Sequence, residues 1–169
     1  MGLIYAAMPG YGRDWFDRQV SSAVLSIRSH VDKVVLFDGS WSGEPSKELP
    51  DWWGTGDCVF VPCGKWGNEP EKRTFMTEWG GPGSWCFWLD TDEILLAGGE
   101  WIRRALQINP NAGRFKVTLI DKDGQTYFRE NMFEHGSYIH GSKDIGIIPT
   151  VIRHIAGRTK SFLTEASRV

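Results

Sequence analysis

The segment Trp85–Leu96, "WCFWLDTDEILL", decides the fold of this 169-residue chain. Its first five residues, Trp85–Leu89, are all apolar, which is typical of a strand that is covered on both faces of a sheet. Three carboxylates follow at once, at Asp90, Asp92 and Glu93. In an open α/β sheet, ligands bind in the crevice beyond the carboxyl ends of the strands. The segment therefore predicts a buried strand that leads directly into a binding site.

Apolar runs and helical patterns alternate along the chain around this segment. The expected strands of the first half are Gly2–Ala7, Lys33–Phe37 and Cys58–Pro62, and the expected helices are Trp15–Ser29, with Asp14 as its cap, and Asn68–Trp79. The second half adds an expected helix at 101–108 and a hairpin in which a strand at 114–120 turns through "DKDG" into "QTYFR". Strand–helix–strand order predicts an α/β fold with a mostly parallel central sheet flanked by helices.

A second acidic residue follows another buried strand. Asp38 ends the apolar run "KVVLF", as Asp90 ends "WCFWL", so both are expected at the same edge of the sheet. If the chain continues extended, Asp90 and Asp92 point to one side, about 6–7 Å apart. Crowded carboxylates repel one another, and a divalent cation with oxygen ligands relieves that repulsion. The other interpretation is that these residues form turns and cap helices.

Composition limits the classes of function. The chain has 19 basic and 21 acidic residues, which gives no reason to expect nucleic acid as a partner. No apolar run approaches the roughly 18 residues of a membrane span, and the first residues lack the layout of a signal peptide. The three cysteines are odd in number and show no metal-binding spacing, which favours reduced thiols and a cytoplasmic protein. At this length we expect a single domain.

The segments "VVLFDGSWSG" and "CFWLDTDEIL" resemble those of the family-2 glycosyltransferases, which have the GT-A fold. "GNEPEKRTFM" stands where that family has a basic helix start, and "TYFRENMF…GSYIHG…VIRHIAGR" is similar to its later arginine–aromatic and histidine segments. The resemblance implies a GT-A-like (Rossmann-like) sheet within one domain, 1–169. Residues 1–96 would be the nucleotide-sugar-binding half, and 97–169 the small, mixed acceptor side with a C-terminal loop.

The resemblance also implies the function and the roles of individual residues. The chain would move a sugar from a nucleoside diphosphate sugar to an acceptor hydroxyl. The expected donor is a UDP-sugar, and the expected cofactor is Mn²⁺ or Mg²⁺. Asp92 and His154 would bind the metal ion. The donor would be held by Asp38 at the base or ribose, Asp90 near the ribose, Arg73 beside the acidic cluster, and Arg158 and Lys160 at the diphosphate.

The catalytic base is the part of the site that the sequence indicates least. An inverting transferase needs a carboxylate that takes a proton from the acceptor hydroxyl. Glu134 in "MFEHG" and Asp144 in "GSKDIG" are the two candidates, and Asp144 lies in the segment Tyr138–Pro149, which we expect to be a mobile wall of the site. Arg129 in "YFRENMF" is expected to form an internal salt bridge.

Two other functions fit parts of the pattern. A glycoside hydrolase could use Asp90 or Asp92 together with Glu93, but hydrolases place the two carboxyls on opposite sides of the scissile bond, usually on different elements. A non-catalytic module that binds a nucleotide or sugar would explain the nine tryptophans and the missing base.

Overall fold

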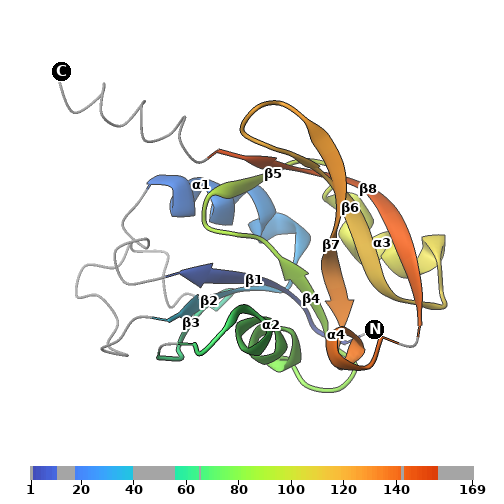
Figure 1. Ribbon diagram of the computed structural model, residues 1–169, viewed down its shortest axis with the longest axis horizontal. Coiled ribbons are helices and arrows are strands. Elements are labelled where there is room, and N and C mark those ends of the chain that lie inside the picture. Colours follow the sequence, from blue (N-terminus) through green and yellow to red (C-terminus); the bar gives the residue numbers. More distant parts are fainter. Residues whose placement is uncertain (1, 11–17, 40–55, 65, 142, 156–169) are drawn as a thin grey trace.

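A computed structural model describes residues 2–10, 18–39, 56–64, 66–141 and 143–155 of the chain. Within them, eight strands form one sheet in the order β3-β2-β1-β4-β7-β6-β8-β5 (Figure 1). The strands are β1 (Ile4–Gly10), β2 (Lys33–Asp38), β3 (Cys58–Pro62), β4 (Trp85–Trp88), β5 (Glu93–Ala97), β6 (Ala112–Ile120), β7 (Thr126–Glu134) and β8 (Asp144–His154). The helices are α1 (Arg18–Ile27), the short 3₁₀ helix η2 (Arg28–His30), α2 (Glu69–Glu78), α3 (Glu100–Ile108) and α4 (Ser137–His140).

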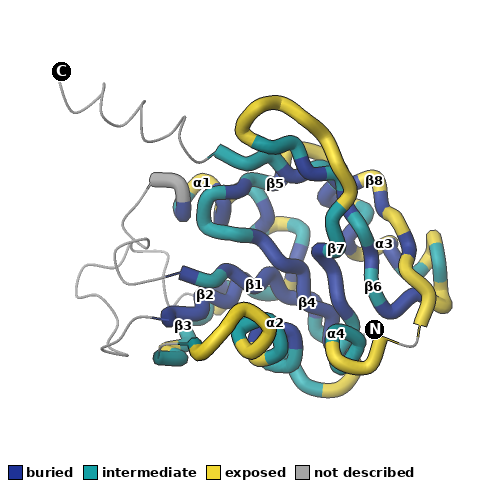
Figure 2. The backbone as a smooth tube through the Cα atoms, in the orientation of Figure 1, coloured by how far each residue is buried: buried dark blue, intermediate teal, exposed yellow. Residues whose placement is uncertain are grey.

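The first half of the sheet is parallel, as its apolar runs predict. β3, β2, β1 and β4 lie side by side in one direction, with Gly10 paired to Asp38 and Ala7 to Trp88. The side chains of β1, β2 and β4 are almost all buried, because helices cover this part of the sheet on both faces (Figure 2). The carboxyl ends of these strands therefore meet at one edge of the molecule.

The second half of the sheet is mixed, as expected for the acceptor side, although it takes up four of the eight strands in the described residues. β7 is antiparallel to β4 and β6, β8 is parallel to β6, and β5 is antiparallel to β8. β5 and β8 are strands that the sequence patterns did not predict. The segment Tyr138–Pro149, expected as a mobile wall, instead contains the end of α4 and the first half of β8.

Helices on the two faces divide the core into two layers. α1 and α3 contribute Val24 and Ile102 to a cluster with Met8 and Leu36 on one face. α2 covers the other face, where its Met76 packs with residues such as Tyr5, Phe37 and Trp88. Figure 1 shows α1 and α2 on opposite sides of β1.

The predicted helices match the structure closely. α2 begins after Asn68, whose side chain accepts a hydrogen bond from the Glu71 N–H at 2.8 Å, and Pro70 lies in its first turn. The predicted cap of α1, Asp14, lies outside the described residues. No helix in the described part of the chain is long and apolar enough to cross a membrane.

Candidate functional site

The segment Asp90–Glu93 is a turn between β4 and β5. The Glu93 N–H donates to the Asp90 carbonyl at 3.0 Å, so the chain reverses instead of continuing extended. The alternation that was expected to place Asp90 and Asp92 on one side of a strand therefore does not apply. Both residues nevertheless line the same pocket, because the turn carries them to the carboxyl edge of the parallel strands.

A buried network holds this turn from behind. The Glu93 carboxylate is fully buried, accepts the Asp90 N–H at 3.0 Å and pairs with the Arg129 guanidinium at 2.8 Å. Arg129 also donates to the Asn131 side chain, which in turn donates to the Trp88 carbonyl at 2.7 Å. The predicted internal salt bridge of Arg129 is thus confirmed, and β7 ties both ends of the turn in place.

Asp92 and His154 contact each other directly. The Nε2 atom of His154 lies 3.0 Å from an Asp92 carboxylate oxygen, and each side chain is about one third exposed. The pair forms because β5 and β8 are antiparallel with Glu93 opposite His154, and the Ile155 N–H donates to the Asp92 carbonyl. Burial raises the pKa of the Asp92 carboxyl above its usual value, and the neighbouring His154 opposes that effect. The two residues assigned to a metal by resemblance are therefore neighbours.

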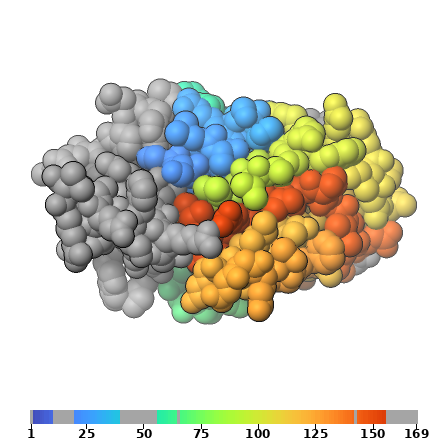
Figure 3. Space-filling view, turned by 90° about the horizontal axis from the view of Figure 1, so that it is seen from above, coloured from blue at the N-terminus to red at the C-terminus, as the bar shows by residue number. Residues whose placement is uncertain are grey.

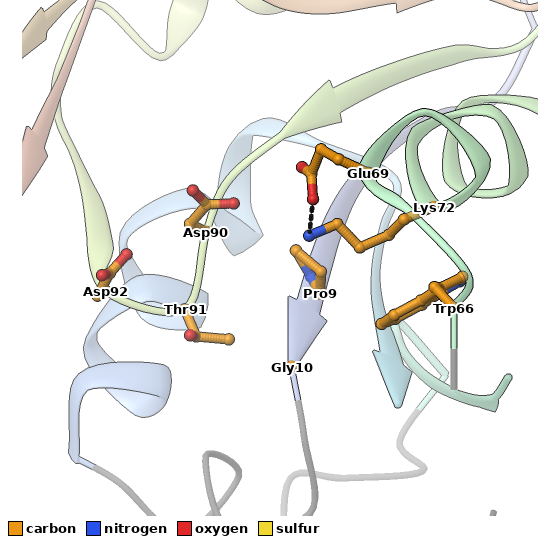
Figure 4. Close-up of a pocket in the computed structure, with 8 residues that line it drawn as sticks. All are labelled: Pro9, Gly10, Trp66, Glu69, Lys72, Asp90, Thr91 and Asp92. Atoms are coloured by element: carbon orange, nitrogen blue, oxygen red, sulfur yellow. Dashed lines mark ion pairs between the residues drawn. The ribbon is translucent and has the colours of Figure 1, made fainter. Parts of the chain in front are cut away.

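A pocket of about 230 Å³ lies between this turn and α2 (Figure 4). Asp90 and Asp92 line one side, and Glu69 and Lys72 of α2 line the other, with the end of β1 between them. The ammonium group of Lys72 pairs with Glu69 at 2.7 Å and lies 5.7 Å from the centre of the Trp88 ring. We call this space the turn pocket. It combines carboxylates with a cation, as a site for a charged ligand requires.

The other donor-binding candidates have different outcomes. Asp38 is fully buried at the end of β2, beside the pocket residue Gly10, so it lies at the predicted edge but below the pocket surface. Arg73 lies 4.8 Å from the centre of the Trp88 ring and pairs with Glu69, while the Trp88 indole N–H donates to Asp90. Arg73 thus reaches the acidic cluster through an aromatic ring. Arg158 and Lys160 lie outside the described residues.

The structure does not bring the two candidate bases to this edge. Glu134 pairs in register with Trp85, at the start of β4, and its carboxylate binds Lys143 at 2.7 Å. Asp144 is exposed at the start of β8, whereas His154 ends the same strand, about 30 Å away for an extended chain. Both carboxylates therefore lie toward the edge opposite the turn.

Some residues of the site were missed by the sequence patterns. Lys72 and Glu69 were not singled out, although their i, i+3 spacing in "NEPEKR" is that of a helical ion pair. Glu93 was taken as part of an acidic cluster, whereas it is the buried acceptor that shapes the turn. Its distance from Arg129 in the chain left no local signal for that role.

The described side chains at this site can hold a metal ion only together with a bound ligand that supplies further oxygen atoms. Among the described residues, no group of three or more His, Cys, Asp or Glu side chains is arranged to hold one. Asp92 and His154 offer one oxygen and one nitrogen, a pair that suits Mn²⁺ when phosphate oxygens and water complete the shell. The residues present fit a metal that is bound together with a substrate.

Comparison with known proteins places the fold. No protein-family model and no curated protein matches the chain. The solved structures that resemble it include a 4-diphosphocytidyl-2C-methyl-D-erythritol synthase (12% identity, TM-score 0.57, 88% of this chain and 90% of that one), the Francisella tularensis 2-C-methyl-D-erythritol 4-phosphate cytidylyltransferase (8%, 0.58, 98% and 99%), and S. aureus TarS 1-349 (12%, 0.50, 74% and 37%). At these identities the likeness shows the fold alone. The chain has the type of α/β fold found in these proteins.

Proposed function

We propose that this protein is a transferase that uses a nucleoside diphosphate sugar as donor, with a divalent cation held by Asp92 and His154. One observation carries the proposal: the direct contact between these two side chains beside a pocket that also holds Asp90 and Lys72. The residues come from segments about sixty positions apart in the chain, so their meeting is a property of the fold. The glycosyltransferase assignment and the preference for a UDP-sugar are part of this proposal.

Each residue of the turn pocket has a distinct task in the proposed reaction. The Asp90 carboxylate, held by the Trp88 indole, accepts hydrogen bonds from the ribose hydroxyls. Lys72 leaves its exposed partner Glu69 to bind a phosphate oxygen, because the diphosphate of the donor carries two negative charges and attracts the ammonium group more strongly. A bound Mn²⁺ or Mg²⁺ supplies Lewis-acid stabilisation of the charge that develops on the leaving diphosphate. The acceptor oxygen bonds to the anomeric carbon, the bond from that carbon to the diphosphate breaks, and the acceptor proton is released.

A nucleotidyltransferase is the second candidate. The share of each similar protein that this chain matches favours this candidate. That share is 90% of the synthase and 99% of the cytidylyltransferase, but 37% of TarS 1-349. In that reaction a sugar phosphate attacks a nucleoside triphosphate and pyrophosphate leaves. The same turn pocket would then hold the triphosphate. The hydrolase interpretation is weakened, because Glu93 is fully buried and paired with Arg129.

Product analysis separates these functions. The protein is incubated with a panel of nucleoside diphosphate sugars, and separately with nucleoside triphosphates plus sugar phosphates, each in Mn²⁺ and in chelator. Release of a nucleoside diphosphate that needs the metal ion and is lost in Asp92→Asn supports the proposal. Release of pyrophosphate supports the second candidate. Metal-dependent nucleotide binding without either product identifies a non-catalytic module and overturns the proposal.

A further inference from the structure

A second pocket, of about 430 Å³, opens on the other side of the turn. It lies between the turn, the end of β8 and the hairpin formed by β6 and β7. We call it the hairpin pocket. Figure 3 shows the hairpin, β8 and β5 side by side on one face of the molecule. Asp90 lines both this pocket and the turn pocket, so molecules in the two would meet at that carboxylate.

We infer that the hairpin pocket binds the acceptor, and that the acceptor is an uncharged, hydroxyl-rich molecule, a sugar or polyol without phosphate. The inference rests on the proposed transferase function and names the class of its second substrate. A donor in the turn pocket and an acceptor in the hairpin pocket would approach each other over Asp90, which is the arrangement that a transfer reaction needs.

A residue that lines the pocket has a buried carboxylate oxygen without a hydrogen-bond donor. Glu93 lines the pocket and is fully buried. Its Oε1 atom binds Arg129 and the Asp90 N–H, but its Oε2 atom has no partner among the described residues. An unpaired buried carboxylate oxygen is costly, and a ligand hydroxyl that donates to it would remove that cost.

Charge selects against an anionic acceptor. The lining includes four carboxylates, those of Asp90, Glu93, Asp121 and Asp123, against two permanent cations, Lys122 and Arg129, and the imidazole of the proposed metal ligand His154. One cation, Arg129, is already paired with Glu93. In the protein without metal, a phosphorylated acceptor would therefore meet mostly like charge, whereas hydroxyl groups can donate to the carboxylates.

An aromatic wall completes the recognition surface. Tyr127 is about half exposed and pairs across the hairpin with Leu119, and both residues line the pocket. The next residue, Phe128, is paired with Thr118 and points to the opposite face of the strand, because side chains alternate along β7. Tyr127 thus offers an apolar ring face to the C–H groups of a sugar beside polar groups that fix its orientation.

Binding of defined sugars tests the inference. Ligand-observed NMR would measure the affinities of the wild-type protein for neutral hexosides, pentitols and their phosphate esters, without nucleotide. We expect at least one neutral probe to bind, and each phosphate ester to bind more weakly than its parent. Tyr127→Ala should weaken that binding at least about tenfold, while the matched control Phe128→Ala should leave it unchanged. Asp123→Lys should reduce the ratio of the affinity for a neutral probe to the affinity for its phosphate ester by up to about fivefold.

The outcomes separate this inference from the proposed function. Binding of none of the neutral probes, stronger binding of the phosphate esters, or equal losses in Tyr127→Ala and Phe128→Ala would overturn it. Calorimetry with uridine diphosphate and Mn²⁺ tests the turn pocket alone. Nucleotide binding without sugar binding defeats only the inference, whereas sugar binding without nucleotide binding defeats the transferase proposal and leaves a sugar site.

Discussion

The parallel half of the sheet, β3-β2-β1-β4, and the mixed half, β7-β6-β8-β5, contribute different chemistry to the site. The parallel half ends in acids, Asp38 and Asp90, which follow apolar strands directly. The mixed half supplies the guanidinium of Arg129, which pairs with Glu93 at the start of β5, and the imidazole of His154, which contacts Asp92 in the turn. Neither half forms the site alone, so the function depends on how β7 and β8 are registered against the turn after β4.

The buried pair Glu93–Arg129 offers the largest test of that dependence. Arg129→Met removes the cation and leaves a buried carboxylate without its partner, because the Glu93 side chain is 1% exposed. We expect the free energy of unfolding to fall by about 3 kcal/mol. Chemical denaturation at neutral pH measures it. The double variant Glu93→Gln/Arg129→Met should recover at least about 1 kcal/mol, since the charge is then gone.

The exposed pair Arg103–Asp32 provides the matched control for this variant. Its side chains are 47% and 39% exposed, so Arg103→Met should cost less than about 1 kcal/mol. Equal losses in Arg129→Met and Arg103→Met would show that the network behind the turn does not hold the two halves together.

Asp92 tests the contribution of the turn between the two halves to metal binding. Asp92→Asn keeps the shape of the side chain and removes the charge that would hold a cation. The affinity for uridine diphosphate in Mn²⁺ should fall at least about tenfold, or roughly 1.4 kcal/mol. In chelator, calorimetry should find similar affinities for the two proteins. Equal affinities in Mn²⁺ would end the assignment of Asp92 as a metal ligand.

His154 tests the contribution of the mixed half to the same ion. We expect His154→Ala to show the same metal-dependent loss, but a smaller one of about threefold to fivefold, because a neutral imidazole attracts a cation less than a carboxylate does. Titration with Mn²⁺ at fixed nucleotide concentration measures it. A loss that is equally large in chelator would show that His154 acts only by supporting the turn through Asp92.

The two halves also differ in how far their structure could be predicted from sequence. Strands such as β2 and β4 are continuous apolar runs, and α2 carries an N-cap and a proline, so local patterns located them. β8 contains Gly146 and Pro149, which are unusual inside strands, and it carries isoleucines at exposed positions, so its sequence does not show the polar–apolar alternation of a strand. The base candidate Asp144 was placed in that segment as if it were a loop, and the strand carries Asp144 away from the turn.

The same limit applies to the site itself. The acids Asp90 and Asp92 could be predicted because both lie in one short segment after a buried strand. The partnership of Glu93 with Arg129, 36 positions apart in the chain, depends on strand pairing that composition does not encode. The position of His154 was predicted only through the resemblance to a family. Its contact with Asp92 follows from the register of β5 against β8.

Replacement of Asp32 has the smallest expected effect on the free energy of unfolding. This carboxylate lies at the surface beside the parallel half, whereas the carboxylate of Glu93 is buried. Its oxygens accept the Ile4 N–H and an Arg103 N–H, each at 2.9 Å. Burial acts to raise the pKa of Asp32, but these two bonds outweigh it and hold the pKa below its usual value of 3.8. A lowered pKa in the folded state adds stability above the unfolded value and loses it as pH falls through the folded value.

The pH dependence of Asp32→Asn follows from that sign. At pH 7 the variant should be less stable than the wild type by less than about 1 kcal/mol, because the carboxylate is well solvated. The difference should shrink as pH falls below 3.8, where the wild-type carboxyl also becomes neutral. Urea unfolding of both proteins across that range measures the difference. If the difference in the free energy of unfolding stayed constant with pH, the shape of the side chain, and not its charge, would tie β1 to α3.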